Sequence, residues 1–581
     1  MTSQTAERGR IAAAAVALGA GLMLTAGPSG AVQAAPTAGP CVGDNGGIAL
    51  PPGFCATVFA DNLGNVRHIA VAPNGVVYAN TWSGRYYPGS KPRAGGFLVA
   101  LQDTDRDGKA DVATPFGETA ADGAAGGTGI GLYKGYVYAE VNDRIVRYAP
   151  AAGSVAPGGK PEVVLSGLPL TGDHPMHPFT IDAKGQLFVD LGSATNACQP
   201  RNRVPGVMGA TPCTESETRG GLWRYDANKL GQKFSPAERY ATGIRNGMGL
   251  SFDGAGRMFA TQHGRDQLLQ NWPKLYPDPA RATELPAEEL LLIKQGGDYG
   301  WPNCYYDNFQ KKLVLAPEYG GDGGKAEGVC AQKLAPVAAF PSHWAPNDLK
   351  IYTAKAFPAA YQGGAFIAFH GSWNRAPAPQ DGFNVVFQPL REGKASGPYV
   401  VFADGFAGPN KASGRAEFRP MGLAVAPDGA LFIADDQKGR IWRVTYQGAP
   451  GAAVAAAPAP APPMAAVKPA APTASASGAA ALPPGVTAEL IAAGQPAFGA
   501  NYCGACHGPD GKGTALGPDL TSGTWMWGDG SPAALSDTIA KGVAAPKRYR
   551  SPMPPMGGAQ LSPDTLAAIT AYVWSVGHKA P

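Results

Sequence analysis

The chain has 581 residues and a formal net charge of +4. This length exceeds that of one ordinary domain, so two or more domains are expected. A net charge this small for the length gives no reason to expect a nucleic-acid partner or a polybasic membrane surface. The 80 glycines and 55 prolines favour a turn-rich β architecture together with a low-complexity segment.

The N-terminus has the features of a secretory signal peptide. Arg8 and Arg10 form a basic region, residues 11–26 are small and apolar, and residues 32–35 offer a small-residue cleavage site. The apolar run is short and rich in Ala and Gly for a membrane anchor. We therefore expect a cleaved signal peptide over residues 1–35, no membrane span in the mature chain, and a periplasmic location in a bacterium.

Six of the eight cysteines lie outside a Cys-x-x-Cys-His motif. In an exported protein these six are expected to form disulfides, although the sequence allows many pairings. The simplest arrangement pairs near neighbours, and a metal site is disfavoured because none of the six has Cys-x-x-Cys spacing. The three local couples are Cys41 with Cys55, Cys198 with Cys213, and Cys304 with Cys330.

A strand–turn–strand pattern recurs between residues 41 and 447. Two apolar strands separated by a Gly-containing turn occur at residues 69–78, 179–188, 248–259 and 421–432. Short β units repeated with similar turn chemistry are typical of a β-propeller. About 400 residues at roughly 40–50 or more per blade predict six blades, with an insertion near residues 267–290. An array of β-sandwiches is the competing fold, but it would lack the repeated turn.

The remainder of the chain predicts a tether and a small all-α domain. Residues 448–484 are almost entirely Ala, Pro, Gly and Ser, which predicts a semi-extended linker. The second domain then occupies residues 485–581, and its first helix is expected over residues 488–502. Ser562, followed by Pro at the first helical position, predicts the start of a helix that runs to about Val576.

The second domain carries a Cys-x-x-Cys-His motif at Cys503, Cys506 and His507. In this motif two thioethers attach haem c, and the adjacent imidazole ligates the iron. A zinc site or a redox dithiol is the alternative for such cysteines, but the context favours haem. The segment resembles the small class I cytochromes, because Gly494 and Phe498 lie where the first helix of that family crosses the last.

Two further segments resemble class I cytochromes. Residues 517–520 resemble the segment whose Pro carbonyl orients the proximal His, and residues 551–556 resemble the loop of the sixth iron ligand. The resemblance favours Met553 as the axial ligand, with Met556 as the alternative. A thioether ligand raises the reduction potential relative to two His ligands.

The long domain has a candidate general base at His174. A His at the inner mouth of a propeller strand can accept a proton from a substrate hydroxyl, although a lone His is more often structural. Five other polar stretches favour a functional site. They are residues 243–250, 262–266, 297–302, 369–375 and 418–423.

Together these motifs resemble the soluble-type glucose/sorbosone dehydrogenases that depend on pyrroloquinoline quinone (PQQ) and are six-bladed propellers. The resemblance extends over about residues 41–447. It implies that His174 is the general base, and that Arg245 and Asn246 contact the reactive quinone carbonyl.

The resemblance also implies that Arg375 and Arg419 hold the carboxylates of PQQ. A tricarboxylate needs several fixed guanidinium groups, and Arg suits planar carboxylate recognition. The sequence departs from the family where Met248 replaces a familiar Gln and Arg375 replaces the Lys of some members.

Two calcium sites follow from the same resemblance. The backbone carbonyls of Gly264 and Arg265 would ligate a Ca²⁺ that the quinone also binds. Glu289 and Tyr299 match positions of a second, structural calcium site. Separately, residues 103–111 have the spacing of a Ca²⁺ loop but lack the Glu at its twelfth position, so an Asp-rich hairpin turn is the alternative.

The sequence therefore predicts a periplasmic quinoprotein sugar dehydrogenase. It would oxidise an aldose or related sugar with PQQ and Ca²⁺, and its own haem c would pass electrons to an external acceptor, a cytochrome or a copper protein. The alternative is a glycan-binding or lactonase-type propeller with a separate electron-carrier cytochrome domain. A quinone enzyme for simple alcohols is disfavoured, because the sequence lacks the adjacent Cys-Cys pair and the tryptophan repeats of that eight-bladed class.

Overall fold

The computed structural model describes most of the chain from residue 41 onward. The described residues are 41, 43–81, 95–118, 127–375, 378–412, 415–449, 451–457, 482–500, 503–508, 511–513, 517–543, 546–549, 553, 555–558 and 561–578. The predicted signal peptide and most of the predicted linker lie outside these residues.

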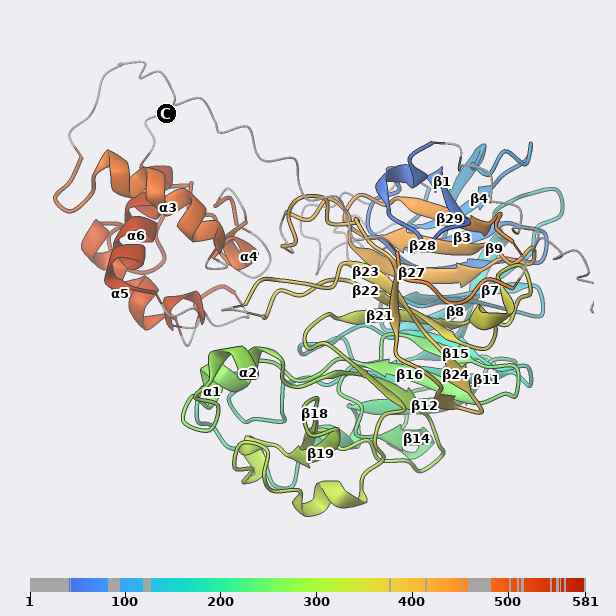
Figure 1. Cartoon of the computed structure of the whole chain (residues 1–581), viewed down its shortest axis with the longest axis horizontal. Coiled ribbons are helices and arrows are strands. Elements are labelled where there is room, and N and C mark those ends of the chain that lie inside the picture. The colour runs from blue at the N-terminus through green and yellow to red at the C-terminus, as the bar shows by residue number, and fades with distance from the viewer. Residues whose placement is uncertain are drawn as a thin grey trace, which may run out of the picture. The chain divides into compact units, whose positions relative to one another are not determined.

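Six sheets, antiparallel except for one parallel edge strand in the second, follow one another along the chain and form a six-bladed propeller, as the sequence predicts. Figure 1 labels many of their strands. The first sheet contains β2 (Val66–Val71), β3 (Val77–Thr81), β4 (Leu98–Gln102) and β5 (Val112–Phe116). The second contains β6 (Ile130–Tyr133), β7 (Tyr136–Val141), β8 (Arg144–Ala149) and β9 (Gly158–Ser166), with β13 (Gln232–Lys233) at its edge. The third contains β10 (Phe179–Ile181), β11 (Gln186–Leu191), β12 (Gly221–Asp226) and β14 (Arg239–Thr242).

The other three sheets have the same four-stranded antiparallel form. The fourth contains β15 (Leu250–Phe252), β16 (Met258–Gln262), β17 (Glu288–Leu292) and β20 (Ala338–Phe340). The fifth contains β21 (Pro346–Ile351), β22 (Ala365–Phe369), β23 (Asn384–Gln388) and β26 (Val400–Ala403). The sixth contains β27 (Pro420–Val425), β28 (Leu431–Asp435), β29 (Ile441–Tyr446) and the N-terminal strand β1 (Phe54–Ala60).

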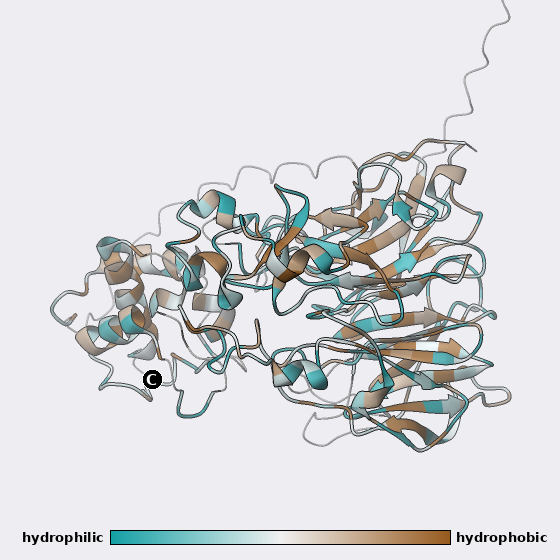
Figure 2. Ribbon diagram, turned by 90° about the horizontal axis from the view of Figure 1, so that it is seen from below, coloured by the Kyte–Doolittle hydropathy of each residue, from teal (hydrophilic) through white to brown (hydrophobic). Residues whose placement is uncertain are grey.

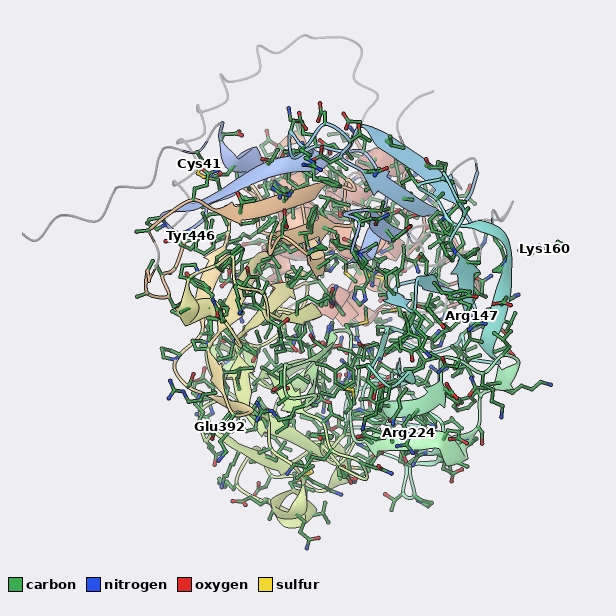
Figure 3. The ribbon with its side chains drawn as sticks, turned by 90° about the vertical axis from the view of Figure 1, so that its right-hand side faces the viewer. Cys41, Arg147, Lys160, Arg224, Glu392 and Tyr446 are labelled. Atoms are coloured by element: carbon green, nitrogen blue, oxygen red, sulfur yellow. A yellow bond between two sulfur atoms is a disulfide. The ribbon has the colours of Figure 1, made fainter. Side chains whose placement is uncertain are left out.

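Strand β1 closes the ring of sheets. It pairs antiparallel with β29, and Phe54 lies opposite Tyr446. The adjacent disulfide joins Cys41 to Cys55 and fixes the segment before β1; Cys41 and Tyr446 lie close together in Figure 3. Because the first and last strands share one sheet, neither end of the propeller domain leaves a blade incomplete.

The repeated turns have the backbone conformation that their glycines allow. Gly75, Gly185 and Gly429 each have φ between 85° and 88°, a region that other residues rarely adopt. Each turn reverses the chain between two strands whose apolar side chains are buried, and Figure 2 shows hydrophobic residues recurring along the strands. The cores therefore lie between neighbouring sheets, as in other propellers.

Insertions decorate the fourth and fifth sheets. The predicted insertion near residues 267–290 contains α1 (Leu268–Asn271) and α2 (Pro279–Thr283), which pack with the hairpin of β18 (Cys304–Asp307) and β19 (Lys312–Leu315) (Figure 1). A second hairpin comprises β24 (Leu390–Arg391) and β25 (Lys394–Ala395). Short 3₁₀ helices are η1 (Asn45–Gly47), η2 (Thr214–Glu217), η3 (Pro236–Glu238), η4 (Pro317–Tyr319), η5 (Gly328–Gln332) and η6 (Ala359–Tyr361).

The local disulfide pairing is confirmed. Bonds join Cys41 to Cys55, Cys198 to Cys213, and Cys304 to Cys330. The start of the predicted linker is attached to the propeller, because the Ala455 amide donates to the Tyr361 hydroxyl at 3.0 Å and the Ala457 amide donates to the Val401 carbonyl at 2.8 Å.

The C-terminal domain is helical, as predicted. Its helices are α3 (Ala488–Ala500), α4 (Cys503–His507), α5 (Pro532–Lys541), η7 (Pro555–Gly558) and α6 (Pro563–Gly577). Gly494 lets α3 approach α6, since a Cβ there would lie 2.0 Å from the Ala568 carbonyl oxygen. The Ser562 side chain accepts from the Thr565 amide at 3.1 Å and caps α6. Among the described residues no helix is both long and apolar enough to cross a membrane.

Candidate active site and haem crevice

Four residues of the third and fourth sheets lie at one end of the propeller. His174 precedes β10 and Ser193 follows β11, whereas Arg245 precedes β15 and Asp266 follows β16. The start of a strand lies beside the end of its antiparallel neighbour, so each couple occupies one end of its sheet. The Ser193 amide donates to the Arg245 carbonyl at 2.7 Å and joins the two couples. We call the site formed by these four residues the propeller mouth.

Arg245 is buried, and its guanidinium donates to several oxygen acceptors. Its guanidinium donates to the Gly264 carbonyl at 2.9 Å, to the Asn196 side-chain oxygen at 3.0 Å and to the Asp266 carboxylate at 2.8 Å. The structure thus brings together Arg245 and Gly264, which the sequence assigned to quinone and calcium binding. Several acceptors hold the planar guanidinium in one orientation.

Asp266 supplies the negative charge of the mouth. Its carboxylate pairs with Arg245 at 2.8 Å and with Arg203 at 2.9 Å, and it accepts from the Asn374 amide nitrogen at 2.8 Å. Burial opposes ionisation of this carboxyl, but the two guanidinium groups outweigh burial and hold the pKa of Asp266 well below its usual range. Asp266 is therefore ionised at neutral pH and pairs with the buried Arg245 and the partly buried Arg203.

His174 is a buried imidazole with one nitrogen engaged. Its Nδ1 lies 2.9 Å from the Ser193 carbonyl oxygen and 3.0 Å from Ser193 Oγ. Burial, together with the positive charge of Arg245, lowers the pKa of His174 to about 3. The ring is neutral at pH 7, as a general base must be before it accepts a proton.

Asn246 lies beside His174 across a glycine. A Cβ at Gly192 would lie 2.6 Å from His174 Cβ and 3.1 Å from Asn246 Oδ1, so only glycine permits this approach. Asn246 Oδ1 is buried and has no hydrogen-bond partner among the described residues. A buried acceptor without a partner is costly, which fits a ligand that donates to it.

The other two predicted carboxylate-binding arginines hold protein groups. Arg375 pairs with Glu284, at the end of α2, and donates to the Ser342 carbonyl at 2.9 Å. Arg419 donates through Nε to the His370 carbonyl at 3.0 Å. Sequence reasoning missed Glu284, because the loop that carries it gives no local signal of a partner 91 residues away.

Each arginine lowers the pKa of a histidine, and one of these histidines contacts the mouth. The pKa of His343 is lowered to about 4 by burial, with Asp266 opposing and Arg375 reinforcing the effect. The pKa of His370 is likewise lowered to about 4, by burial and by the charge of Arg419. Arg375 therefore acts on a His that Asp266 also contacts, at 3.7 Å, whereas Arg419 acts on a different His.

A further ion-pair group was missed by sequence reasoning. Arg67 donates to the Asp436 carboxylate at 2.8 Å, and His370 Nε2 lies 2.6 Å from the same carboxylate. These residues come from the first, fifth and sixth sheets. No spacing in the sequence joins them, so only the closure of the ring shows their contact.

The predicted calcium residues have mixed surroundings. The Gly264 carbonyl accepts from Arg245, and the guanidinium of Arg265 pairs with Glu318 at 2.5 Å. The hydroxyl of Tyr299 is used by backbone groups, since it donates to the Leu292 carbonyl at 2.7 Å. No contact between the side chains of Glu289 and Tyr299 is recorded among the described residues.

Two other acidic features bear on metal binding. One oxygen of Glu289 accepts from the Gln262 amide at 3.1 Å, the other has no partner among the described residues, and burial raises the pKa of Glu289 to about 8. Oxygen atoms of Asp103, Asp105 and Asp111 lie within 4.8 Å of one another. The same carboxylates accept from backbone amides of their own loop.

The cytochrome domain contains a mostly apolar crevice around the Cys-x-x-Cys-His motif. Cys503, Cys506, His507 and Met553 all line it. His507 Nδ1 lies 3.0 Å from the Pro518 carbonyl oxygen, which is the contact that the sequence predicts. Met556 is not among the lining residues that the structure describes, which favours Met553 as the iron ligand.

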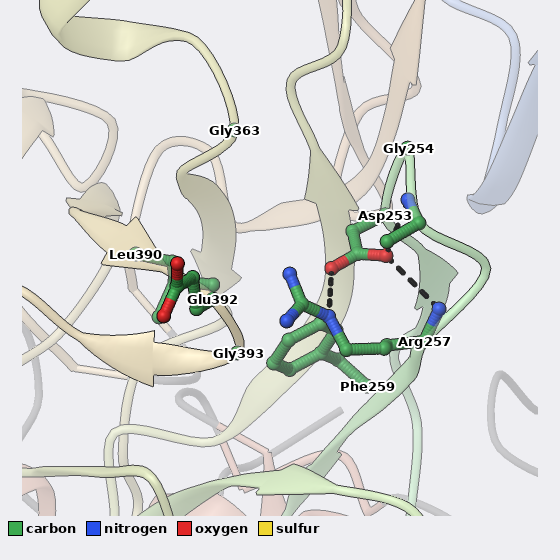
Figure 4. A pocket seen from close by; sticks show the side chains of 9 residues that line it. Asp253, Gly254, Arg257, Phe259, Gly363, Leu390, Glu392 and Gly393 are labelled. Atoms are coloured by element: carbon green, nitrogen blue, oxygen red, sulfur yellow. Dashed lines mark hydrogen bonds and ion pairs between the residues drawn. The ribbon is translucent and has the colours of Figure 1, made fainter. Parts of the chain in front are cut away.

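A second crevice, of about 250 Å³, lies at the opposite end of β15 and β16 from the mouth. Its lining includes Asp253, Arg257 and Glu392, which sit on turns (Figure 4). Arg257 already donates to Asp253 at 2.7 Å. This crevice contains none of the predicted site residues.

Comparison with known families agrees with a propeller followed by a cytochrome domain. The TrAA12-like family matches residues 123–447, which is more than half of the chain. The chain belongs to the TrAA12-like family. A cytochrome c family also matches residues 491–577, so the TrAA12-like propeller is joined to a cytochrome c segment in one chain.

Individual proteins resemble each part of this TrAA12-like chain. A PQQ-dependent pyranose dehydrogenase of Coprinopsis cinerea is 27% identical over 239 residues, which are 36% of this chain and 31% of that protein. The oxidase subunit FixP of Azorhizobium caulinodans is 42% identical over 82 residues, which are 14% of this chain and 25% of that protein. The match thus covers less than two thirds of either relative.

A solved structure shares the propeller fold. The carbohydrate-active enzyme of family AA12 from Trichoderma reesei superposes with a TM-score of 0.54 at 18% identity, covering 69% of this chain and 98% of that one. At this identity the likeness concerns the fold, and the roles of residues in the mouth rest on their own geometry.

Proposed function

We propose that this chain is a periplasmic quinohaemoprotein that oxidises an aldose or related sugar with PQQ and Ca²⁺ in the propeller and passes the electrons through its own haem c. One observation carries the proposal. His174 and Arg245, assigned separately to proton and quinone chemistry, are joined through Ser193 at one mouth. A neutral base and a fixed guanidinium at one site suit the oxidation of a hydroxyl group.

The residues of the mouth fit PQQ. When bound, PQQ supplies the carbon that accepts hydride from the sugar. The unpartnered Oδ1 of Asn246 would receive a donor, and the guanidinium of Arg245 would face the carbonyl where negative charge develops. Arg375 and Arg419 would hold cofactor carboxylates, Arg375 by exchanging Glu284 for a cofactor carboxylate.

The oxygen atoms around Arg245 are also of the type that binds a hard cation such as Ca²⁺. The carbonyls of Gly264 and Arg265 would ligate Ca²⁺, and Glu289 and Tyr299 would contribute to a second calcium site. Ca²⁺ prefers carbonyl and carboxylate oxygens, which these residues offer. Bound beside the quinone carbonyl, it would act as a Lewis acid.

His174 performs the proton step. Its Nε2 has no hydrogen-bond partner among the described residues, because both recorded bonds use Nδ1. A sugar hydroxyl placed against Nε2 loses its proton to His174 as the adjacent carbon loses hydride. The sugar thus gives up one proton and one hydride, which carries two electrons, and it becomes a lactone or ketone.

The cytochrome domain accounts for the electrons. Cys503 and Cys506 would attach haem c, with His507 and Met553 as axial ligands in the crevice that all four line. When bound, haem c supplies a one-electron acceptor, so each sugar requires two transfers. An external cytochrome or copper protein would then take each electron. The three disulfides accord with the proposed export through a cleaved signal peptide over residues 1–35.

Cofactor binding and dehydrogenase activity test the proposal together. We would titrate the haem-loaded chain with PQQ, with and without Ca²⁺, by calorimetry and then assay aldoses with an artificial electron-accepting dye. We expect saturable binding that depends on Ca²⁺, and dye reduction that depends on sugar. Arg245→Lys should weaken PQQ binding, because Lys cannot replace the planar fork. The matched control Arg443→Lys, in an exposed pair with Asp428, should not. Absence of PQQ binding would contradict the proposal.

A further inference from the structure

Ser193 is the residue through which the base and the guanidinium are connected. Its side chain is fully buried. Its amide donates to the Arg245 carbonyl at 2.7 Å, and its carbonyl accepts from the His174 amide at 3.2 Å and lies 2.9 Å from His174 Nδ1. A single residue therefore binds the backbone of both His174 and Arg245, which belong to different sheets.

The hydrogen bonds of Ser193 determine where the imidazole carries its proton. Ser193 Oγ donates to the Thr195 carbonyl at 2.6 Å, so its only proton is committed. Toward His174 Nδ1 the hydroxyl can then only accept, and the Ser193 carbonyl can only accept. Because two acceptors face Nδ1, Nδ1 must carry the proton, and in the neutral ring Nε2 is the basic nitrogen.

The direction of the Ser193 hydroxyl is itself fixed by a rigid loop. Glu215 accepts from the amide of Ala194 at 2.6 Å and from the amide and the hydroxyl of Thr195 at 3.0 and 2.7 Å. The Cys198–Cys213 disulfide closes the same loop. The Thr195 carbonyl is thus held in place to take the proton of Ser193.

We propose that Ser193 is the positioning residue of this site. It fixes His174 in the Nδ1–H form, so that Nε2 is the base, and it holds His174 in a constant position relative to Arg245. The catalytic part of this inference rests on the proposed function. The protonation pattern does not, because it follows from contacts within the chain alone.

A neutral partner gives His174 a different pH response from a carboxylate partner. The charged or titratable groups that act on this ring are Asp173, Arg203, Arg245 and His263. The single carboxylate among them, Asp173, is paired with Arg203 at 3.0 Å. No anion therefore accepts from Nδ1 among the described residues, and the charge of Asp173 only partly offsets the cost of burying a charged imidazolium. The base stays unprotonated in mildly acidic solution.

The direct test is histidine NMR on the full haem-loaded chain, with ¹⁵N-labelled His and His174→Gln to assign the signal. We expect the wild-type ring to be neutral and protonated at Nδ1 at pH 7. Ser193→Asp, which places a carboxylate against Nδ1, should raise the pKa of His174 by about 1–3 pH units. Protonation at Nε2 in the wild type would overturn the proposal, and so would an unchanged titration in a folded Ser193→Asp variant.

Kinetics of the PQQ- and Ca²⁺-loaded enzyme provide the second readout. Ser193→Ala removes one of two acceptors and should lower kcat about 10-fold or more with little change in KM, because the fault lies in base orientation. Ser193→Thr keeps the hydroxyl and should restore most of kcat. The matched control is Ser251→Ala, which removes a half-buried hydroxyl that accepts from the Ile351 amide. The kcat of this variant should equal the wild-type value. Equal losses in the Ala and Thr variants would overturn the positioning role.

The two tests separate failure of this inference from failure of the proposed function. A chain that oxidises no sugar but shows the Nδ1–H form, with the Ser193→Asp shift, would remove the enzyme assignment and leave the role of Ser193 in the protonation pattern intact. A chain that oxidises sugar but carries the His174 proton at Nε2 would keep the enzyme assignment and remove the proposed role of Ser193.

Discussion

In the cytochrome domain, Cys503, Cys506 and His507 lie on the single short helix α4, and the Pro518 carbonyl that meets His507 is only 11 residues away. At the propeller mouth, the Arg245 guanidinium contacts groups that lie 19 to 49 residues away in the chain. The haem site is thus a local motif whose cysteines would bind haem c covalently, whereas the mouth is a network of ion pairs. We therefore expect substitutions at the haem site to act by removing the covalent attachment of haem. Substitutions at the mouth should act by leaving a charge without its partner.

A double variant of the haem cysteines tests most strongly whether the two sites are independent. Cys503→Ser with Cys506→Ser should abolish covalent haem completely, because both thioethers are lost. Haem staining after denaturing electrophoresis measures this. The propeller should be unaffected, so dye-linked sugar oxidation by the PQQ-loaded variant should continue at the wild-type rate. Loss of that dye-linked rate would show that the two regions are not independent.

The converse variant removes the proposed base and spares the haem. His174→Ala should lower kcat for sugar oxidation by about 10²–10⁴-fold, the usual contribution of a positioned acid or base. The wild-type rate should show no loss from protonation of His174 between pH 7 and pH 5, because the pKa of this buried His is about 3. Steady-state rates across that pH range check both statements. Dithionite should still reduce the haem of the variant.

Charge balance at the mouth is tested by Asp266→Asn. Removing one partner of a buried ion pair typically costs about 3–5 kcal/mol, because the remaining cations are left uncompensated. Arg245 would be left in that state, whereas Arg203 would keep its pair with Asp173. Denaturant unfolding of the propeller measures the loss. The matched surface variant Glu417→Gln, whose pair with Lys438 is about half exposed, should cost about 0–1 kcal/mol. Equal losses would contradict the network.

The ionisation of Asp266 also determines how the stability of the propeller depends on pH. The folded-state pKa of Asp266 lies below its ordinary value. Its contribution is therefore complete above the ordinary Asp pKa of about 3.9 and is lost as the pH falls through the folded-state value. The stability difference between wild type and Asp266→Asn should consequently be constant at neutral pH and shrink only in strong acid.

The axial ligand distinguishes two neighbouring methionines. Met553→Ala should remove the thioether-to-iron charge-transfer band and lower the reduction potential, because Met553 lines the crevice. Met556→Ala should leave both unchanged, and it serves as the control. Absorption spectra and a redox titration measure the outcome. The reverse pattern would assign the ligand to Met556.

The smallest expected effect concerns Glu284. It occupies Arg375, which the proposed cofactor must engage. Glu284→Gln removes the competing charge, so PQQ affinity should rise by a few-fold, consistent with the modest value of a partly exposed pair. Calorimetric titration checks this. Weaker binding in the variant would indicate that Glu284 supports the site instead of competing for it.

Sequence patterns predicted what depends on local chemistry. The turn glycines such as Gly75 and Gly429 take the positive φ that their turns need, and the near-neighbour disulfides form as expected. Ser562 caps its helix, and His507 meets the Pro518 carbonyl. In each case the determining contact lies within a short stretch of chain, where spacing and residue type suffice.

The parts that the sequence did not reveal depend on long-range closure. The pairing of β1 with β29 joins residues nearly 400 positions apart. Ser193 and Asn196 lie in a polar loop with no motif, yet they hold His174 and Arg245 through the antiparallel ends of separate sheets. Local propensity carries no information on which loops meet at the end of a propeller, so these contacts required the structure.

The most direct test of the coupling between the two regions is rapid mixing of the oxidised, haem-loaded chain, reconstituted with PQQ and Ca²⁺, against an aldose while the reduced haem α band is followed. We predict haem reduction that requires both sugar and PQQ, is lost in His174→Ala, and has a rate constant independent of protein concentration, because donor and acceptor belong to one chain. A haem that dithionite reduces but no sugar reduces would contradict the account.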